Sequence, residues 1–164
     1  MSIVADILKT AALRLSIIHP DNGFAFEVHK IHLPIQDGEE YTPEHLSIIV
    51  TADEDSIERE TELDRPGNPP AIAFVLPILI ECVIIPSNHN CETFDTFAST
   101  IYSNMASAIT IWPDWHQFDR RCLNSEVGRP VYKPPTDDGG IGSVQFTILA
   151  TYRVDETNLE NLRG

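Results

Sequence analysis

The order of four segments in the second half of the chain constrains the fold more than any other feature. A continuous apolar run spans Ala71 to Ile85, and a helical pattern follows from Glu92 to Ile111. A polar stretch then leads to Ser143–Val154, where apolar and polar residues alternate. We therefore expect a small α+β domain: a mostly antiparallel β-sheet with two main helices packed on it and long loops.

The apolar run Ala71–Ile85 predicts the centre of the sheet. Thirteen of its 15 residues are apolar, which is typical of a strand region that is covered on both faces. Pro77 predicts a division into two shorter strands, or a bulge, because proline cannot donate to a central ladder. Alternation predicts further strands at Phe24–Val28 and Leu46–Val50, and most clearly at Ser143–Val154.

Two helices are expected, one on each side of the apolar run in sequence. Between Ile3 and Ile18 apolar residues recur at helical spacing, with Ser2 as the expected cap. From Phe94 to Ile109 a second apolar stripe predicts a helix capped by Asn90 and buried in the core. We expect the roughly 30 residues that follow, up to Gly142, to form a long loop, which in a compact domain is often functional.

Size and charge limit the classes of function. We expect residues 1–164 to form a single domain, because 164 residues is the length of one ordinary domain. The formal charge is −14, and residues 37–64 hold a net −10 of it, which predicts a solvated acidic loop at Asp53–Asp64. Residues 117–133 carry a net +2. A chain this acidic repels phosphate, so direct DNA binding is not expected.

Membrane insertion and disulfide bonding are not expected either. The apolar run is shorter than the roughly 20 residues of a membrane helix and contains Pro77 and Glu81. The amino terminus lacks the uninterrupted apolar stretch of a signal peptide. Three cysteines at irregular spacing favour reduced thiols in a cytosolic protein.

Motifs for catalysis or cofactor binding are missing from the sequence. It contains no Gly-x-Ser-x-Gly elbow, and its glycine-rich stretch at residues 139–142 precedes a strand instead of opening a helix. The pairs His89 with Cys91 and His29 with His32 lack the spacing of a four-ligand zinc site. We therefore predict no catalytic residue, no cofactor and no metal, and that the protein is not an enzyme.

An aromatic cluster follows the second helix. Trp112 and Trp115 lie just before Arg120 and Arg121, and aromatic and arginine side chains are enriched at the centres of protein interfaces. Two interpretations stay open: the indoles pack back over the helix end, or part of this segment forms an interface.

Taken together, these features resemble the tail terminator proteins of long-tailed bacteriophages. The resemblance lies in the amino-terminal helix, the broken apolar strand region, the helix beginning near Cys91 and Glu92, the Trp-Pro-Asp-Trp exit at Trp112–Trp115, and the closing segment Phe146–Asn158. It covers about two-thirds of the chain. It implies an α+β fold with helices on a mostly antiparallel sheet, assembled as a hexameric ring.

The resemblance also implies a place and partners. Such a ring caps the finished tail tube, stops its polymerisation and meets the neck or connector proteins, while DNA only passes through its channel. The protein would then be a virion component at the tail–neck junction, assembled in the host cytoplasm, with no membrane partner.

Lumen or interface residues follow from charge under this resemblance. Part of the acidic segment is expected to face the channel or a neighbouring subunit, and basic residues of the later loop to meet acids across a ring contact. The candidates are Asp53, Glu54, Asp55, Glu58, Trp112, Trp115, Arg120, Arg121 and Arg129.

Two other classes fit the same sequence. A neighbouring neck component, such as a head-completion or stopper protein, would also be small, acidic and ring-forming. A small cytosolic enzyme that uses scattered carboxylates is the alternative from a different class, and it would need a cleft with a strongly perturbed acid or histidine.

Overall fold

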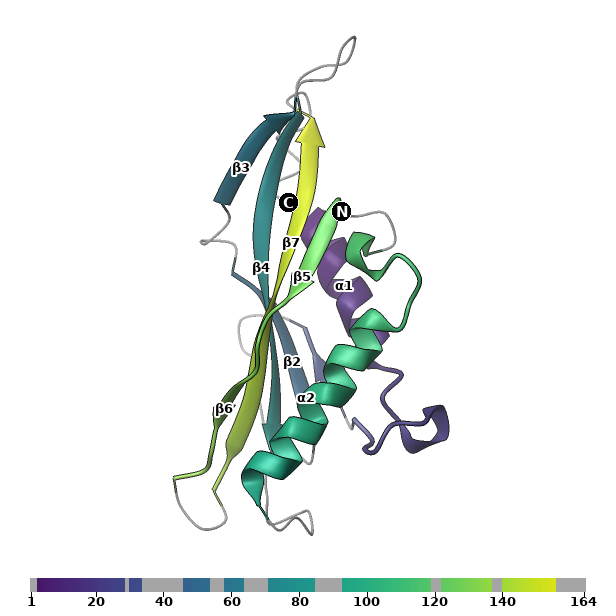
Figure 1. Cartoon of the computed structure of the whole chain (residues 1–164), viewed down its shortest axis with the longest axis vertical. Helices are drawn as coiled ribbons and strands as arrows, with labels where there is room; N and C mark the ends of the chain where they lie inside the picture. Colours follow the sequence, from purple (N-terminus) through teal and green to yellow (C-terminus); the bar gives the residue numbers. More distant parts are fainter. Residues whose placement is uncertain are drawn as a thin grey trace.

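The chain folds into an α+β structure in which two helices pack on a mostly antiparallel sheet (Figure 1). The computed structural model describes residues 3–28, 30–33, 46–53, 58–63, 71–84, 93–118, 122–136 and 140–155. For residues 30, 58–63, 71, 72, 154 and 155 it describes the backbone alone.

Seven strands form the described sheet, and two of them dominate it. Strands β4 and β7 run antiparallel over 14 residues each, from the pair Ala71–Asp155 to the pair Ile84–Gly142. Each is flanked by two short strands along its outer edge: β2 and β3 on β4, β5 and β6 on β7. The bounds are β1 Lys30–His32, β2 Ser47–Ala52, β3 Glu58–Leu63, β4 Ala71–Ile84, β5 Asn124–Val127, β6 Val131–Lys133 and β7 Gly142–Asp155. Among the described strands, only β1, which pairs with β2, lies parallel to its neighbour.

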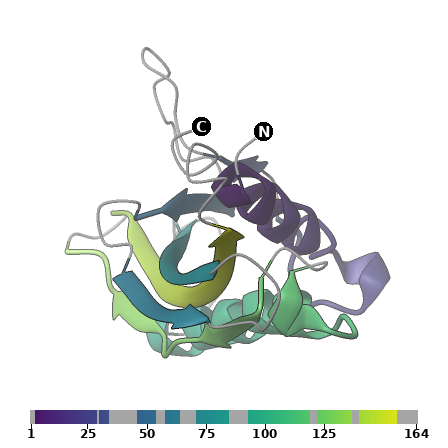
Figure 2. The ribbon, with the colours of Figure 1, turned by 90° about the horizontal axis from the view of Figure 1, so that it is seen from above.

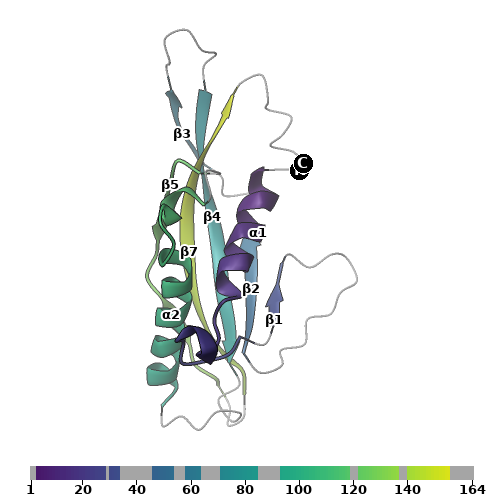
Figure 3. The same cartoon turned by 90° about the vertical axis from the view of Figure 1, so that its right-hand side faces the viewer.

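Both helices cover the same face of this sheet. Helix α1 (Ile3–Leu15) lies over β2 and β1, and α2 (Phe94–Thr110) lies over β7 (Figure 3). Seen from above, the strands curl, with α1 to their right and α2 below them (Figure 2). Because side chains alternate along a strand, the even-numbered residues of β4 and β7 face the helices. These residues are buried: Leu76, Ile78, Ile80, Cys82, Ile84, Val144, Phe146, Ile148, Ala150 and Tyr152.

The long strands extend past the helices. At one end of the molecule β3 and the adjoining ends of β4 and β7 project beyond α1 and α2 (Figures 1 and 3). There Phe74 stacks on Tyr152 at a centroid distance of 5.8 Å. Tyr152 is fully buried in the core and Phe74 packs against it, so the core reaches the base of this projecting ribbon.

The predicted break at Pro77 is wrong, because β4 is continuous through it. Strand β3 pairs with Ala71–Val75 and β2 with Ile78–Val83, so Pro77 lies between the two ladders. The Asp53 amide donates to the Pro77 carbonyl oxygen (3.0 Å), which therefore points to this edge. The nitrogen and carbonyl of one strand residue share a side, so the missing N–H removes no hydrogen bond to β7.

The expected strand at Phe24–Val28 is also wrong, although its alternation is reflected in burial. Phe24, Phe26 and Val28 are half-buried against the core, while Ala25 and Glu27 are exposed, yet the segment pairs with no described strand. It is held by other contacts instead. The Phe26 ring meets Phe97 edge-on at 4.8 Å, and the Ala25 amide donates to Asn104 Oδ1 of α2.

Two segments predicted as loops contain strands. Within the acidic stretch, Glu58–Leu63 is β3, and the long segment after α2 contains β5 and β6. None of the three has a strong apolar alternation, because each is a short edge element whose hydrogen bonds come from a long apolar neighbour. Helix α2 begins after Thr93, whose Oγ1 accepts from the Thr96 amide, so Asn90 is not its cap. The remaining expected elements, at Leu46–Val50 and Ser143–Val154, are confirmed as β2 and β7.

A tight crossing joins α2 to the sheet where β5 passes into β6. The Gly128 amide donates to the Thr147 carbonyl oxygen at 2.8 Å, and a Cβ at Gly128 would lie 2.8 Å from the same oxygen. Tyr102 of α2 donates from its hydroxyl to the Gly128 carbonyl at 3.0 Å, and its ring meets Phe146 edge-on. Tyr102 therefore holds both α2 and the Gly128 connection between β5 and β6 against β7.

Removing this hydroxyl tests that role. We expect Tyr102→Phe to lower the free energy of unfolding by about 1 kcal/mol, because one half-buried hydrogen bond is lost and the ring stays. Tyr132→Phe, at an exposed position in β6, is the matched control and should change it by less than about 0.5 kcal/mol. Urea unfolding measures both. Equal effects would show that the Tyr102–Gly128 bond contributes nothing.

Candidate functional site

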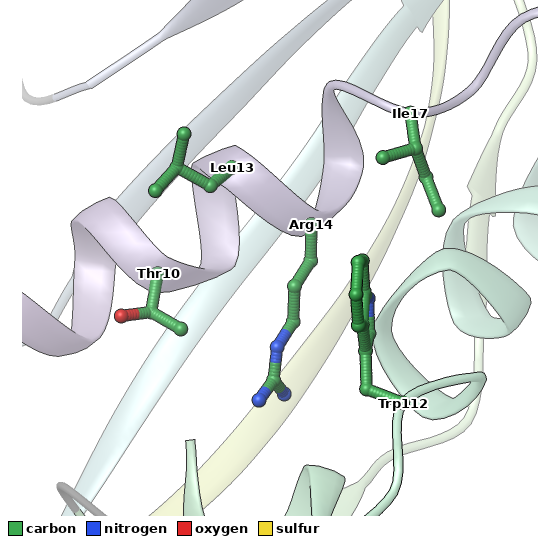
Figure 4. Close-up of a pocket in the computed structure, with 5 residues that line it drawn as sticks. All are labelled: Thr10, Leu13, Arg14, Ile17 and Trp112. Carbon is green, nitrogen blue, oxygen red and sulfur yellow. The ribbon is translucent and has the colours of Figure 1, made fainter. Parts of the chain in front are cut away.

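A hollowed surface lies where the end of α1 faces the exit of α2. A pocket of about 260 Å³ is lined by Thr10, Leu13, Arg14, Ile17 and Trp112 (Figure 4). Leu13 is 71% exposed and Trp112 is 42% exposed, although both are large apolar residues. Trp112 is held in place because its Nε1 donates to the Ala108 carbonyl oxygen at 3.1 Å.

A second hollow adjoins the first across Leu13. It measures about 350 Å³ and lies between α1 and β1, lined by Lys9, Ala12, Leu13, Ser16, Ile31 and Leu33. Leu13 lines both hollows and so forms the ridge between them. We call this surface the helix patch and define it by Leu13, Ile17, Ile31, Leu33 and Trp112.

A buried arginine supports the helix patch from below. Arg14 is 4% exposed, and its Nη1 donates to the Trp115 carbonyl oxygen at 3.0 Å. Its guanidinium carbon lies 4.6 Å from the centre of the Phe118 ring, within the range of a cation–π contact. One side chain of α1 thus holds the turn that follows α2.

That turn has an unusual backbone. The 3-10 turn Trp115–Gln117 is bounded by Asp114 at φ 57° and Phe118 at φ 42°, both in the left-handed region. Aspartate tolerates this region, but a bulky residue such as phenylalanine adopts it only where its surroundings fix it. Phe118 is fully buried under Arg14, so burial and the cation–π contact hold the strained conformation.

The described side chains that line this surface are mostly apolar. Within the described ranges no group of three His, Cys, Asp or Glu residues could hold a metal ion. His19 lies 3.4 Å from Asp21 and 3.8 Å from Glu27, at the exposed turn before β1. The described helices include none that is long and apolar enough to cross a membrane.

The Cys82 thiol has a clearly shifted pKa. Burial, and to a lesser degree the negative charge of Glu81, raises the pKa of the Cys82 thiol from 9.0 to about 12. A thiol reacts through its thiolate, so Cys82 is inert at neutral pH. It is a core residue of β4.

The structure brings together only part of the predicted site. Trp112 and Trp115 lie on one turn: Trp115 packs against the core, while Trp112 lines an open pocket. An interface role for this segment stays a prediction. Arg129 is exposed between β5 and β6. Glu54, Asp55, Arg120 and Arg121 lie outside the described residues, as do His29, His89 and Cys91.

The acidic candidates that the structure describes are at the ends of two strands. Asp53 is exposed at the end of β2, and Glu58 begins β3, where only its backbone is described. Their role as lumen residues stays a prediction.

Sequence reasoning missed Leu13 and Arg14. Arg14 carried a usable signal, because it shares a helical face with Ile7, Ala11 and Ile18, at intervals of four and three residues. A charged residue on an apolar stripe is buried with partners or ends at a functional surface. The sequence contained no such signal for Leu13, since exposed leucines are common.

A comparison of the chain with models of known protein families finds no match, and a comparison with curated proteins finds none either.

The role of Arg14 can be tested by replacing it with methionine, which keeps an unbranched side chain but removes the guanidinium group. We expect Arg14→Met to lower the free energy of unfolding by about 1–3 kcal/mol, because the Trp115 carbonyl loses a charged donor and Phe118 loses the cation above its ring. Arg14→Lys should not restore the wild-type value, since an ammonium lacks the planar fork.

Denaturation followed by tryptophan fluorescence reports on this change directly. Arg129→Met, the same substitution at an exposed position, is the control and should alter stability by less than about 0.5 kcal/mol. If Arg14→Met is equally silent, Arg14 does not hold the turn.

The raised pKa of the Cys82 thiol predicts that the free energy of unfolding falls in alkaline solution. Between pH 9 and about pH 12 the unfolded chain has lost the proton that the folded thiol retains, so unfolding becomes more favourable as the pH rises. This group should lower the free energy of unfolding by about 1.4 kcal/mol per pH unit in that window and have no pH-dependent effect below it.

The comparison is between the wild type and Cys82→Ala, unfolded in urea at several pH values from 8 to 11. The alanine variant loses packing at every pH, but its stability should fall less steeply above pH 9 than that of the wild type. Parallel curves would contradict a raised thiol pKa. Iodoacetamide at pH 8 should leave Cys82 unlabelled until the protein is unfolded.

Proposed function

We propose that this chain is a structural protein of phage tail terminator type, which forms a ring, of six copies by the resemblance, on the end of a tail tube and joins the tail to the neck. The observation that carries the proposal is the fold. The resemblance implies helices on a mostly antiparallel sheet, and the chain has two helices on one face of such a sheet.

The distribution of exposed apolar residues supports an assembling protein. Large apolar side chains are exposed on the helix patch, and others lie on β6, β7 and the segment between them: Val131, Tyr132, Ile141 and Leu149. Contiguous exposed apolar surface marks interaction sites, and a ring subunit needs at least two.

The charge supports a channel component. The acidic segment includes β3, which carries Glu58, Glu60 and Glu62 on the ribbon that projects past the helices (Figure 3). An acidic surface repels the phosphates of DNA, so a lumen lined by it lets DNA pass without binding. We propose β3 and the neighbouring Asp53 for the lumen or for a contact with the next subunit.

The mass of the purified chain in solution tests this function. We expect light scattering and negatively stained images to show a ring, either alone or as a cap at one end of added tail tubes from a long-tailed phage. Rings that ignore tubes would favour another neck component. A chain that stays monomeric with and without tubes contradicts the proposal.

A further inference from the structure

On the face of the sheet opposite the helices, the middle of β4 has the wrong composition for a surface in water, whereas β7 is mostly polar there. Antiparallel sheets that face solvent on one side alternate apolar and polar residues. Strand β4 does not, because Val75, Pro77 and Leu79 point away from the helices and are apolar, like its inward residues. Its sequence is that of a strand covered on both faces. On the second face Ala73 and Val83 are buried and Val75, Pro77 and Leu79 are half-buried, and no described helix or strand lies over them.

Apolar residues of the neighbouring strands extend this surface. Leu149 of β7 is directly opposite Pro77 and is 41% exposed. Val131 of β6 pairs with Gln145 of β7, on the same face, and is 50% exposed. We call this surface the sheet patch and define it by Val75, Pro77, Leu79, Val131 and Leu149.

The sheet patch and the helix patch lie on opposite sides of one subunit. Odd-numbered residues of β4 and β7 form the first, while the second lies on the outer side of α1, beyond the helix-covered face. Patches on opposite sides cannot meet in a two-fold contact between identical surfaces without leaving one of them uncovered. A head-to-tail contact covers both, and repeated around a rotation axis it closes a ring.

Each patch also has features that suit a contact with the other. The helix patch has two hollows separated by Leu13, whereas the sheet patch presents exposed branched side chains at Leu149 and Val131. At the rim of the helix patch is Lys9, and beside Leu149 on the adjacent strand is the exposed carboxylate of Glu126. Opposite charges at the edge of an apolar contact set its register.

We infer that the helix patch of one copy binds the sheet patch of the next copy, and that this contact builds the ring. The inference rests on the proposed function and adds the surfaces and the polarity of the subunit contact. Leu149 and Val131 of one subunit then enter the hollows beside Leu13 of its neighbour.

Two single variants separate this contact from every symmetric one. Leu13→Glu places a charge on the helix patch, and Leu149→Glu places one on the sheet patch. Because each contact uses one patch of each kind, either variant alone should be monomeric at concentrations where the wild type is assembled. An equimolar mixture should give a heterodimer and nothing larger, since only the intact sheet patch of the first and the intact helix patch of the second can pair.

Native mass spectrometry with one variant labelled by nitrogen-15 identifies that heterodimer. Leu123→Glu changes an exposed leucine outside both patches and should assemble as the wild type does. Circular dichroism checks that each variant is folded. If Leu149→Glu unfolds, Leu149→Thr keeps a strand-forming side chain like those of Thr147 and Thr151 and should still raise the concentration needed for assembly at least tenfold.

The outcomes distinguish the contact from the function. A wild type that forms rings while both glutamate variants also form them overturns the inferred contact and leaves the ring function standing. Assembly that survives in Leu149→Glu but not in Leu13→Glu indicates a symmetric contact between helix patches and also overturns it. A wild type that neither assembles nor binds tail tubes overturns both proposals.

Discussion

The antiparallel pairing of β4 with β7 is the constraint on which the rest of the structure depends. Fourteen consecutive residue pairs fix the register of both strands, and a shift by one residue would turn every inward side chain outward. The inward row, from Leu76 to Ile84 and from Val144 to Tyr152, is the surface on which both helices pack. The short strands β3 and β6 form by hydrogen bonding to the free edges of β4 and β7, so they need little apolar pattern of their own.

A second constraint acts across the helices rather than the sheet. Arg14 leaves the apolar face of α1 and reaches the Trp115 carbonyl and the Phe118 ring, so the end of α1 and the exit of α2 are held as one unit. Without such a link the turn would have to hold Phe118 in the left-handed region on its own. The same contact sets the position of the turn that carries Trp112 beside Leu13, and so the shape of the helix patch.

The sequence predicts an element of this structure well when the pattern that forms it lies in its own residues, and poorly when the element depends on a neighbouring strand. Strand β7 and helix α2 were predictable, because their periodicity is written in their own residues. Strand β3 was not, since its glutamates favour a loop and its hydrogen bonds come from β4. The Phe24–Val28 segment shows the converse: its alternation predicted burial correctly but carried no information on pairing. Pro77 led to a wrong prediction of a break in β4. Its effect depends on which neighbouring strand its backbone nitrogen and carbonyl face, and that is known only in the assembled sheet.

The composition of β4 links the fold to the assembly. A strand that is apolar on both faces needs cover on both faces, and the two helices supply it on one. Exposed apolar surface in water carries a free-energy penalty in proportion to its area, so the second face gains from any partner that removes it from solvent. The helix patch is a surface of the same kind on the other side of the same subunit, with a hollow on either side of Leu13. A second copy is the partner that satisfies both needs with one contact, because in a closed ring every sheet patch meets a helix patch and neither remains exposed.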